Sequence, residues 1–307
     1  MILFRDLPVV NMEEHMFRSD SVLRVAVQKS GRLSEKSLEI ISHCGIDFNK
    51  SSRVLKSRAE NFPMEFLYLR DDDIPGYVYD GIADIGIVGK NEMDEKGYDV
   101  KLVRDLAFSK CRLSIAVPYD VSYTSLADLT GKQIATSYPN ILRKCLKDRG
   151  VEAGIHEISG SVEIAPTIGL TDAICDIVST GSTLISNGLK EVEVLYRSSA
   201  VLISRNNLAE ESSEKQGILD RLLLRIDAVM RARHYKYIMF NLPSDTVSRV
   251  NEIIPGMKSP TVTPLLDKSW SSVQTVVQED DFWNVFEALK GIGAQGILVT
   301  GIEQMTL

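Results

Sequence analysis

The sequence predicts an α/β protein with two similar lobes and a smaller C-terminal domain. Apolar strands alternate with helical patterns from residue 23 to residue 204, which is typical of α/β architecture with largely parallel sheets. A short echo, in which a glycine and an acid three residues later precede a strand, occurs at Gly81 and Asp84 and again at Gly169 and Asp172. Two similar lobes facing a cleft would produce it. After residue 233 the order becomes βαββαβ, the ferredoxin-like arrangement.

The first element is a strand at 23–27, followed by a helix in which Leu38, Ile41 and Cys44 recur every three residues. We expect Gly45 to end this helix, because glycine readily adopts the left-handed conformation of a helix C-cap. Further strands are expected at 64–69, 85–88, 113–117, 133–136, 173–178, 192–196 and 201–204. Helices are expected between most of them, at 74–80, 140–149, 161–170 and 184–191.

A connecting helix is expected at 219–233, before the C-terminal domain. The strands of that domain are expected at 237–242, 261–265, 270–278 and 296–302. Its helices are expected at 245–254, where Pro255 and Gly256 follow as a stop signal, and at 281–290. The segment 270–278 alternates in polarity, as expected of a strand with one buried face.

Composition and charge exclude several classes of protein. A net charge of −7 argues against a general nucleic-acid binder, and no stretch is long and apolar enough to cross a bilayer. The first 20 residues lack the basic head and the apolar core of a secretion signal. The four cysteines have no metal-ligand spacing, so we interpret them as buried free thiols. We therefore expect a cytoplasmic protein that binds neither nucleic acid nor a membrane.

The most specific segment is a hydroxyl-rich loop between the strand at 173–178 and a helix. Its residues are Ser179, Thr180, Gly181, Ser182 and Thr183. Small residues let the backbone approach an anion closely, and no lysine follows as it does in the P-loop of NTPases. Asp176, just before the loop, could accept hydrogen bonds from the hydroxyls of a ribose. From these residues alone, a phosphate cradle and a plain strand–helix turn are both open.

A longer stretch around this loop carries a family resemblance. The sequence EIAPTIGLTDAICDIVSTGSTL at 163–184 resembles the signature of ATP phosphoribosyltransferases, except that Thr171 stands where Ala, Ser or Gly is expected. Further segments resemble that family in the expected order: QKSGRL at 28–33, RDDDIPG at 70–76, DIGIVG at 84–89, CRLS at 111–114 and ATSYP at 135–139. The resemblance covers about residues 23–305 and implies two lobes of the type II periplasmic-binding-protein kind.

The resemblance implies a site for phosphoribosyl pyrophosphate around the loop. The five loop residues would bind its 5′-phosphate, and Asp176 would meet its ribose. Glu163 and Asp172 belong to the same expected site. We expect Lys29, Arg32 and Asp176 to be the catalytic residues.

The resemblance also implies an ATP site next to the first strand. Lys29 and Arg32 follow that strand; a solvated loop is the alternative, but polyphosphates need fixed positive charge and arginine matches their oxygens. The residues expected to contact ATP are Gly31, Arg32, Asp72, Asp73, Arg112 and Tyr138. Three alternatives stay open: a surface ion pair for Arg112, a helix cap for the acids, and a packed turn tyrosine for Tyr138.

The activity that the resemblance implies joins ATP to 5-phosphoribosyl 1-pyrophosphate, at the first step of histidine biosynthesis. Adenine N1 attacks C1′, so no activated serine or cysteine is needed. Mg²⁺ is the expected cofactor, carried mainly by the substrate phosphates, and its protein ligands are unknown. The alternative is a cytoplasmic ligand-sensing or solute-binding protein of the same two-lobed fold.

The expected domains are an N-terminal extension (1–20), catalytic lobe I (21–113 and 194–222), catalytic lobe II (114–193) and a regulatory domain (227–307). The resemblance implies that the last binds histidine as an allosteric inhibitor, and that the chain forms a homohexamer. Its expected histidine contacts are Ser259, Thr261, Thr263 and Leu265.

Overall fold

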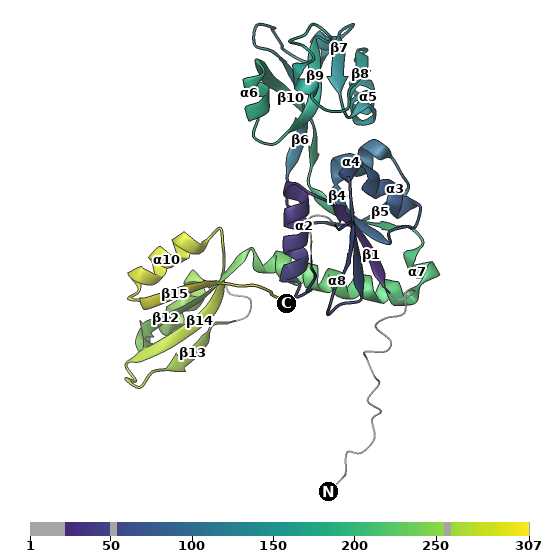
Figure 1. Cartoon of the computed structure of the whole chain (residues 1–307). Coiled ribbons are helices and arrows are strands. Elements are labelled where there is room, and N and C mark those ends of the chain that lie inside the picture. Colours follow the sequence, from purple (N-terminus) through teal and green to yellow (C-terminus); the bar gives the residue numbers. More distant parts are fainter. Residues whose placement is uncertain (1–21, 50–53, 255–258, 307) are drawn as a thin grey trace. The chain divides into compact units, whose positions relative to one another are not determined.

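The structure, a computed structural model, describes residues 22–49, 54–254 and 259–306. The extension expected at 1–20 lies outside these residues. The chain divides into two compact units, one over 47–218 together with the chain up to Glu39, the other over 40–46 and from Leu219 onward. The domain limits given above stay predictions. Figure 1 shows the elements along the chain.

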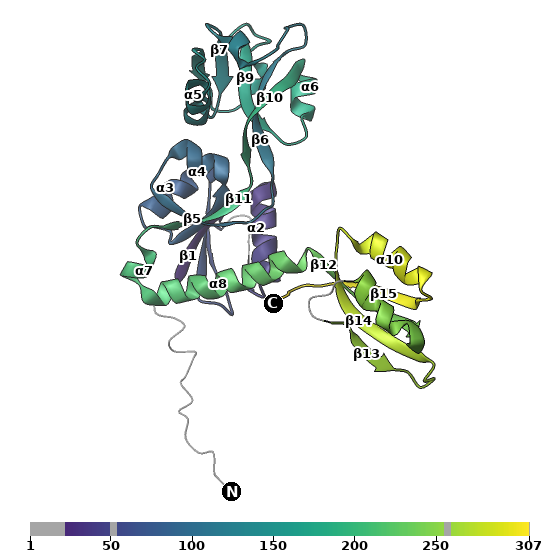
Figure 2. The same ribbon diagram turned by 180° about the vertical axis from the view of Figure 1, so that it is seen from behind.

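The first sheet has six strands in the order β2-β3-β1-β4-β11-β5. They are β1 (Leu23–Gln28), β2 (Lys56–Arg58), β3 (Met64–Leu69), β4 (Ile85–Gly89), β5 (Val100–Asp105) and β11 (Ala200–Arg205). Strand β1 runs parallel to β3 and β4, whereas β11 runs antiparallel to β4 and β5. Helices α3 (Ile74–Tyr79) and α4 (Lys90–Lys96) lie on the same side of this sheet (Figure 2).

The second sheet has five strands in the order β10-β6-β9-β7-β8. They are β6 (Cys111–Pro118), β7 (Gln133–Thr136), β8 (Gly154–Glu157), β9 (Ala173–Val178) and β10 (Leu189–Ser198). Strand β7 runs parallel to β8 and β9, and β6 runs antiparallel to β9 and β10. Helices α5 (Pro139–Asp148) and α6 (Ser182–Ser186) lie on opposite sides of this sheet (Figures 1 and 2).

The two sheets repeat one structural detail at the start of a strand. Asp84 exchanges hydrogen bonds with Arg24: its backbone N–H donates to the Arg24 carbonyl (2.9 Å), and its Oδ2 accepts the Arg24 N–H (2.9 Å). Asp172 does the same with Gln133, at 2.9 Å and 2.8 Å. The glycines three residues before both acids have positive φ. The echo in the sequence therefore marks equivalent positions in two similar lobes.

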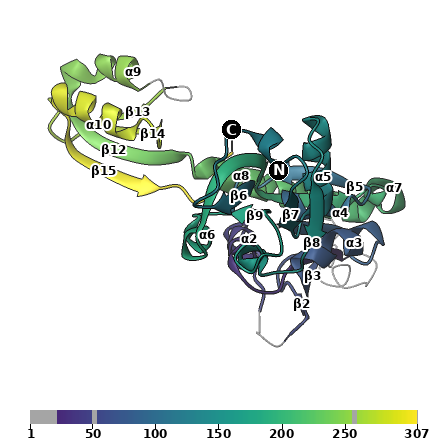
Figure 3. The ribbon, with the colours of Figure 1, turned by 90° about the horizontal axis from the view of Figure 1, so that it is seen from above.

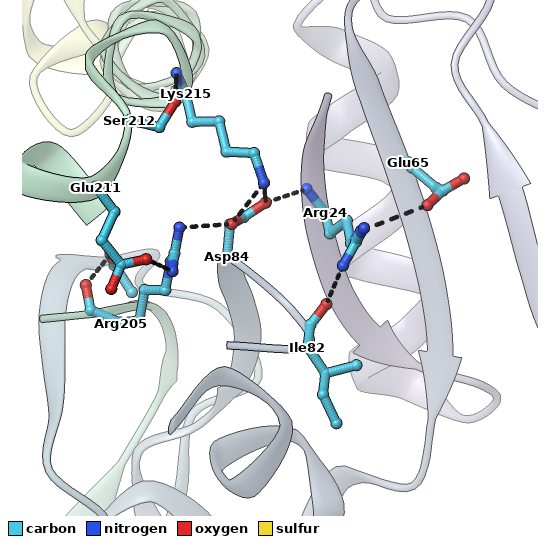
Figure 4. A network of polar contacts seen from close by, with 9 residues as sticks. Arg24, Glu65, Ile82, Asp84, Arg205, Glu211, Ser212 and Lys215 are labelled. Carbon is cyan, nitrogen blue, oxygen red and sulfur yellow. Dashed lines mark hydrogen bonds and ion pairs between the residues drawn. The ribbon is translucent and has the colours of Figure 1, made fainter. Parts of the chain in front are cut away.

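Asp84 is also the centre of a polar network (Figure 4). Its carboxylate is 2% exposed and accepts from Lys215 Nζ at 2.9 Å and 3.0 Å, while Arg205 Nη2 lies 3.3 Å away. Arg205 also pairs with Glu211. Helices α7 (Leu208–Glu211) and α8 (Ser213–Ala232) follow β11, so the network attaches the start of α8 to the first sheet.

The C-terminal domain has the predicted ferredoxin-like topology. Its strands β12 (Tyr235–Pro243), β13 (Thr261–Pro264), β14 (Trp270–Gln278) and β15 (Gln295–Gly301) form a sheet in the order β13-β14-β12-β15. Every neighbouring pair is antiparallel. Helices α9 (Val250–Ile253) and α10 (Phe282–Gly291) lie on one face of this sheet (Figure 3). Phe240 and Val273 of the sheet belong to the same buried cluster as Leu289 of α10.

Three predictions of local structure are wrong. The sheets are mixed rather than largely parallel, because β6, β10 and β11 run against their neighbours. The segment 161–170 is a 3-10 turn at Val162–Ile164 followed by turns, since Pro166 has no N–H to donate to Val162. The helix expected at 184–191 ends at Ser186, because Gly188 has φ +71° and β10 begins at Leu189.

The structure also bears on the expectations of free cysteines and of no membrane-spanning segment. All four cysteines are free; Cys44 and Cys175 are buried, and Cys111 and Cys145 are half-buried. Within the described ranges, no helix is both long and apolar enough to cross a membrane. Helix α2 (Arg32–His43) ends as predicted, with Gly45 at φ +68°.

Candidate active site

A cleft of about 330 Å³ is lined by residues from both lobes. This volume is in the range of small-ligand pockets. Its lining includes Gln28, Arg32 and Asp71 from the first lobe, and Tyr138, Ile177 and Ser179 from the second. A larger hollow, of about 840 Å³, lies between α5 and β8 and contains none of the predicted site residues. The cleft is therefore the candidate active site.

The hydroxyl-rich loop lies at the carboxyl end of β9, where its first residue reaches the cleft lining. Gly181 has φ +84°, a conformation that L side chains rarely adopt, so the turn requires glycine. Ser179, Thr180, Ser182 and Thr183 are all exposed, and the hydroxyls of Thr180 and Ser182 lie 3.1 Å apart. The loop thus presents its hydroxyls to solvent at the end of the cleft.

Asp176 lies in β9, two residues before the end of the strand. Burial, followed by the negative charge of Glu163, raises the pKa of its carboxyl to about 6, although the Ile177 N–H hydrogen bond acts in the opposite direction. Glu163 is thus close enough to act electrostatically on Asp176, which precedes the loop. When no ligand is bound, this carboxylate is poorly solvated, so a hydrogen bond from a hydroxyl group of a ligand would stabilise its ionised form.

The structure does not bring Asp172 to the loop. It precedes β9, whereas the loop follows that six-residue strand. Its carboxylate accepts the Gln133 N–H and pairs with Lys132 Nζ at 3.3 Å, and these contacts lower its pKa. Its place corresponds to that of Asp84 in the other lobe, which points to a structural role.

Several cations lie at the end of β1. Arg32 lines the cleft, and it follows Gly31, whose φ is +93°. Lys29 is exposed and is not among the lining residues. Lys36 and Lys110, which were not among the predicted site residues, also line the cleft. Lys36 lies one helical turn after Arg32 on α2, a spacing that could have indicated it.

Arg112 is not among the lining residues of the cleft, but it contacts the first residue of the loop. Its Nε and Nη2 each donate to Glu191 at 2.5 Å, and its Nη1 donates to the Ser179 carbonyl at 3.1 Å. Ser114 donates to the same carboxylate at 2.7 Å. The Arg112 hydrogen bonds lower the pKa of Glu191. Arg112 therefore holds the start of the loop against β10.

The three aspartates at 71–73 form a 3-10 turn before α3. Asp71 lines the cleft. Asp72 pairs with Arg70 Nε at 3.2 Å and with Lys96 Nζ at 3.8 Å, and Asp73 is exposed without capping α3 through its side chain. Asp72 and Asp73, the two aspartates that were predicted to contact ATP, are thus not among the lining residues of the cleft.

Tyr138 lines the cleft and joins the two lobes. Its hydroxyl donates to Glu92 Oε1 at 2.8 Å, and burial raises its pKa. Glu95 makes a second link: its carboxylate accepts the N–H groups of Asn140 and Ile141, both at 2.9 Å, at the start of α5. Neither glutamate was predicted, because each contact joins residues about 45 positions apart.

The residues expected to bind histidine lie at the edge of the C-terminal sheet. Thr261 and Thr263 are in β13, and Ser259 precedes that strand. These three are exposed, and Leu265 is half-buried.

The fold and the cleft define a class: a two-lobed α/β protein of the type II periplasmic-binding-protein kind, with an appended ferredoxin-like domain. Sequence profiles define the family within that class. The profile of ATP phosphoribosyltransferase matches residues 70–228, and that of the HisG C-terminal domain matches residues 232–304. The chain belongs to the ATP phosphoribosyltransferase family, in its long form with the C-terminal domain.

Individual relatives agree with this assignment. The chain is 58% identical to an ATP phosphoribosyltransferase of Cytophaga hutchinsonii over 93% of its length and 99% of the relative. It is 53% identical to one of Parabacteroides distasonis, over 92% and 99%. Among solved structures, an ATP phosphoribosyl transferase (HisG:HisZ) complex from Thermotoga maritima has a TM-score of 0.56 at 26% identity, covering 67% of this chain and 99% of that one.

Proposed function

We propose that the cleft joins ATP to 5-phosphoribosyl 1-pyrophosphate and releases pyrophosphate, the first step of histidine biosynthesis (EC 2.4.2.17). The observation that supports this proposal is that Ser179, at the start of the hydroxyl-rich loop, lines one interlobe cleft together with Arg32, Lys36 and Lys110, while Asp176 lies three residues before that serine in β9. The lone pair of adenine N1 forms the new bond to C1′. The bond from C1′ to the pyrophosphate oxygen breaks, and the pyrophosphate leaves with its electrons.

The chain's own residues position two polyanions for this in-line displacement. We assign the 5′-phosphate to the loop and the ribose hydroxyls to Asp176, with Glu163 beside it. Arg32 and Lys29, joined by Lys36 and Lys110, would face the phosphate groups and stabilise the charge that develops on the departing pyrophosphate. We assign Arg112 to positioning the loop through Ser179 rather than to binding ATP, and we leave Asp172 out of the site.

We propose that ATP enters from the side of β1 and the turn at 71–73. Tyr138, with Gly31, would lie against the nucleotide. Asp71, as a lining residue, is a better candidate than Asp72 or Asp73 for a contact with ATP.

Mg²⁺ would accompany the substrates as the counter-ion of their phosphates. No three His, Cys, Asp or Glu side chains within the described ranges are grouped to hold a metal ion. The residues thus offer no protein cage, and we derive no step through a resident metal.

The C-terminal domain is the proposed sensor for histidine. The residues that we assign to catalysis all precede residue 190, which favours another role for this domain, and the exposed hydroxyls of Thr261 and Thr263 could bind the polar groups of an amino acid. Inhibition requires that histidine bind the inhibited state more tightly than the active one. We also propose a homohexamer and a cytoplasmic location.

Isothermal titration with each substrate separately tests the division of roles. Arg32→Ala should weaken binding of a phosphate-bearing substrate by about 1.5–3 kcal/mol, the scale of hydrogen bonds to charged groups. Asp176→Asn should weaken binding of phosphoribosyl pyrophosphate more than that of ATP. Equal losses for both substrates in both variants would contradict the assignment.

A further inference from the structure

Glu92, on α4, has a carboxylate with one occupied and one open oxygen. Glu92 is only 8% exposed, yet it is one of the residues that line the cleft. Oε1 accepts hydrogen bonds from the Tyr138 hydroxyl at 2.8 Å and from Asn91 Nδ2 at 3.0 Å. Over the residues that the structure describes, nothing donates to Oε2, and Oε2 is not among the solvent-inaccessible atoms without a partner. The carboxylate is thus fixed through one oxygen, and its other oxygen is left without a donor in a residue that lines the cleft.

The surroundings of Glu92 favour a donor as its ligand. Burial raises the pKa of its carboxyl; the Tyr138 hydrogen bond and Lys96 lower it, while Asp71 and Asp72 raise it. Two aspartates and one lysine thus act on this carboxyl group, and its ionised oxygens can accept hydrogen bonds but cannot donate them. An acceptor group of a ligand would be repelled here, whereas an N–H group with partial positive charge would be stabilised.

We propose that Glu92 Oε2 accepts a hydrogen bond from the 6-amino group of the adenine ring and so selects ATP over 6-oxo purine nucleotides. This assignment rests on the proposed function, because it concerns the nucleotide of that same cleft. Inosine and guanosine nucleotides carry a carbonyl oxygen at position 6. This oxygen would face the carboxylate oxygen, and because both atoms are acceptors no hydrogen bond could form between them. A site built around a hydrogen bond discriminates strongly against an analogue that cannot make it.

The same contact would act on the reaction. When N1 uses its lone pair to bond to C1′ and the C1′–O bond breaks onto pyrophosphate, the adenine ring gains a positive charge. That charge is shared between N1 and N6, so the N6–H group becomes a stronger donor. A carboxylate on N6 then interacts more strongly in the transition state than in the ground state, which is the condition for catalysis.

The test compares ATP with purine riboside triphosphate, which keeps N1 but has no 6-amino group. Affinities come from calorimetry and kcat/KM from pyrophosphate release, on the full chain. The wild type should prefer ATP by at least about tenfold, the scale of a hydrogen bond to a charged group, and Glu92→Met should reduce this preference to about twofold or less. Glu92→Gln, whose amide can donate, should bind inosine triphosphate more tightly than the wild type does.

Glu95→Gln is the matched control, because Glu95 lies on the same helix and is also buried but contacts α5 instead of the cleft. It should alter both affinities alike and leave their ratio unchanged. A wild type that binds both nucleotides equally, or a Glu92→Met variant that keeps the full preference, overturns the assignment. Absence of turnover with ATP would overturn the proposed function instead, since the calorimetric ratio needs no turnover and decides on Glu92 separately.

Discussion

Replacing Asp176 by asparagine should make the free protein more stable while it abolishes activity. In the folded chain the pKa of this carboxyl is about 6, against an ordinary value of 3.8. The folded state therefore holds the proton more tightly than the unfolded state does, so the ionised carboxylate is disfavoured by folding. The contribution of this group to the stability of the chain is greatest below pH 3.8 and is lost as the pH rises through about 6. Asparagine keeps the shape of the side chain and carries no charge.

The size of the effect follows from the two pKa values. A pKa difference of about 2 corresponds to about 3 kcal/mol, and the partial exposure of Asp176 reduces this, so we expect ~1–3 kcal/mol above pH 7. For a domain of this size, that raises the Tm by roughly 3–8 °C.

Differential scanning calorimetry at pH 5 and at pH 8 measures this effect. The stabilisation by Asp176→Asn should be nearly complete at pH 8 and clearly smaller at pH 5. Asp172→Asn, just before the same strand, is the control: its carboxylate has a lowered pKa, chiefly through the Gln133 N–H, so its replacement should destabilise the chain at neutral pH. An Asp176→Asn variant that is less stable than the wild type at pH 8, or equally stable at both pH values, would refute the reasoning.

Four other predictions follow from single features. Gly181→Val should abolish turnover without unfolding the chain, because valine strains a loop at φ +84°; near-normal kcat/KM for phosphoribosyl pyrophosphate would contradict the loop assignment. Asp84→Ala should cost about 3–5 kcal/mol in urea unfolding, since it removes the carboxylate partner of the largely buried Lys215 and one of the two carboxylate partners of Arg205, and a loss below about 1 kcal/mol would be inconsistent with that network. Thr171→Val should stabilise the chain by ~1 kcal/mol, because the buried Thr171 hydroxyl has no partner among the described residues; destabilisation would show that it has one. Millimolar histidine should inhibit the intact chain and not a truncation after residue 225, and indifference of the intact enzyme would exclude the sensor.

Strongly patterned segments could be predicted from the sequence. The strands at 64–69, 133–136, 173–178 and 270–278 have the expected bounds, because each has an apolar run or a clear alternation between turn signals. The strands that were missed, β2, β5 and β8, have no buried residue, so tertiary pairing rather than local pattern makes them strands.

The candidate site was predictable only where its residues are contiguous. The loop at 179–183 stood out because five small, mostly hydroxylated residues follow a strand. Glu92 did not, because it lies in the highly charged segment KNEMDEK, which resembles a solvated helix. Its burial depends on Tyr138, 46 positions away, and no local pattern indicates that contact. Lys110 was missed for a related reason, since only the pairing of β6 in the second sheet brings it to the cleft.

The most direct test of the central claim is the product of a reaction with ATP, 5-phosphoribosyl 1-pyrophosphate and Mg²⁺. We predict release of pyrophosphate in equal amount to a product in which the ribose C1′ is bonded to adenine N1, observed by nuclear magnetic resonance. Asp176→Asn should abolish both signals, while the Asp172→Asn control should retain them. A chain that binds either substrate but releases no pyrophosphate would be a ligand-binding protein of the same two-lobed fold, and the account would be wrong.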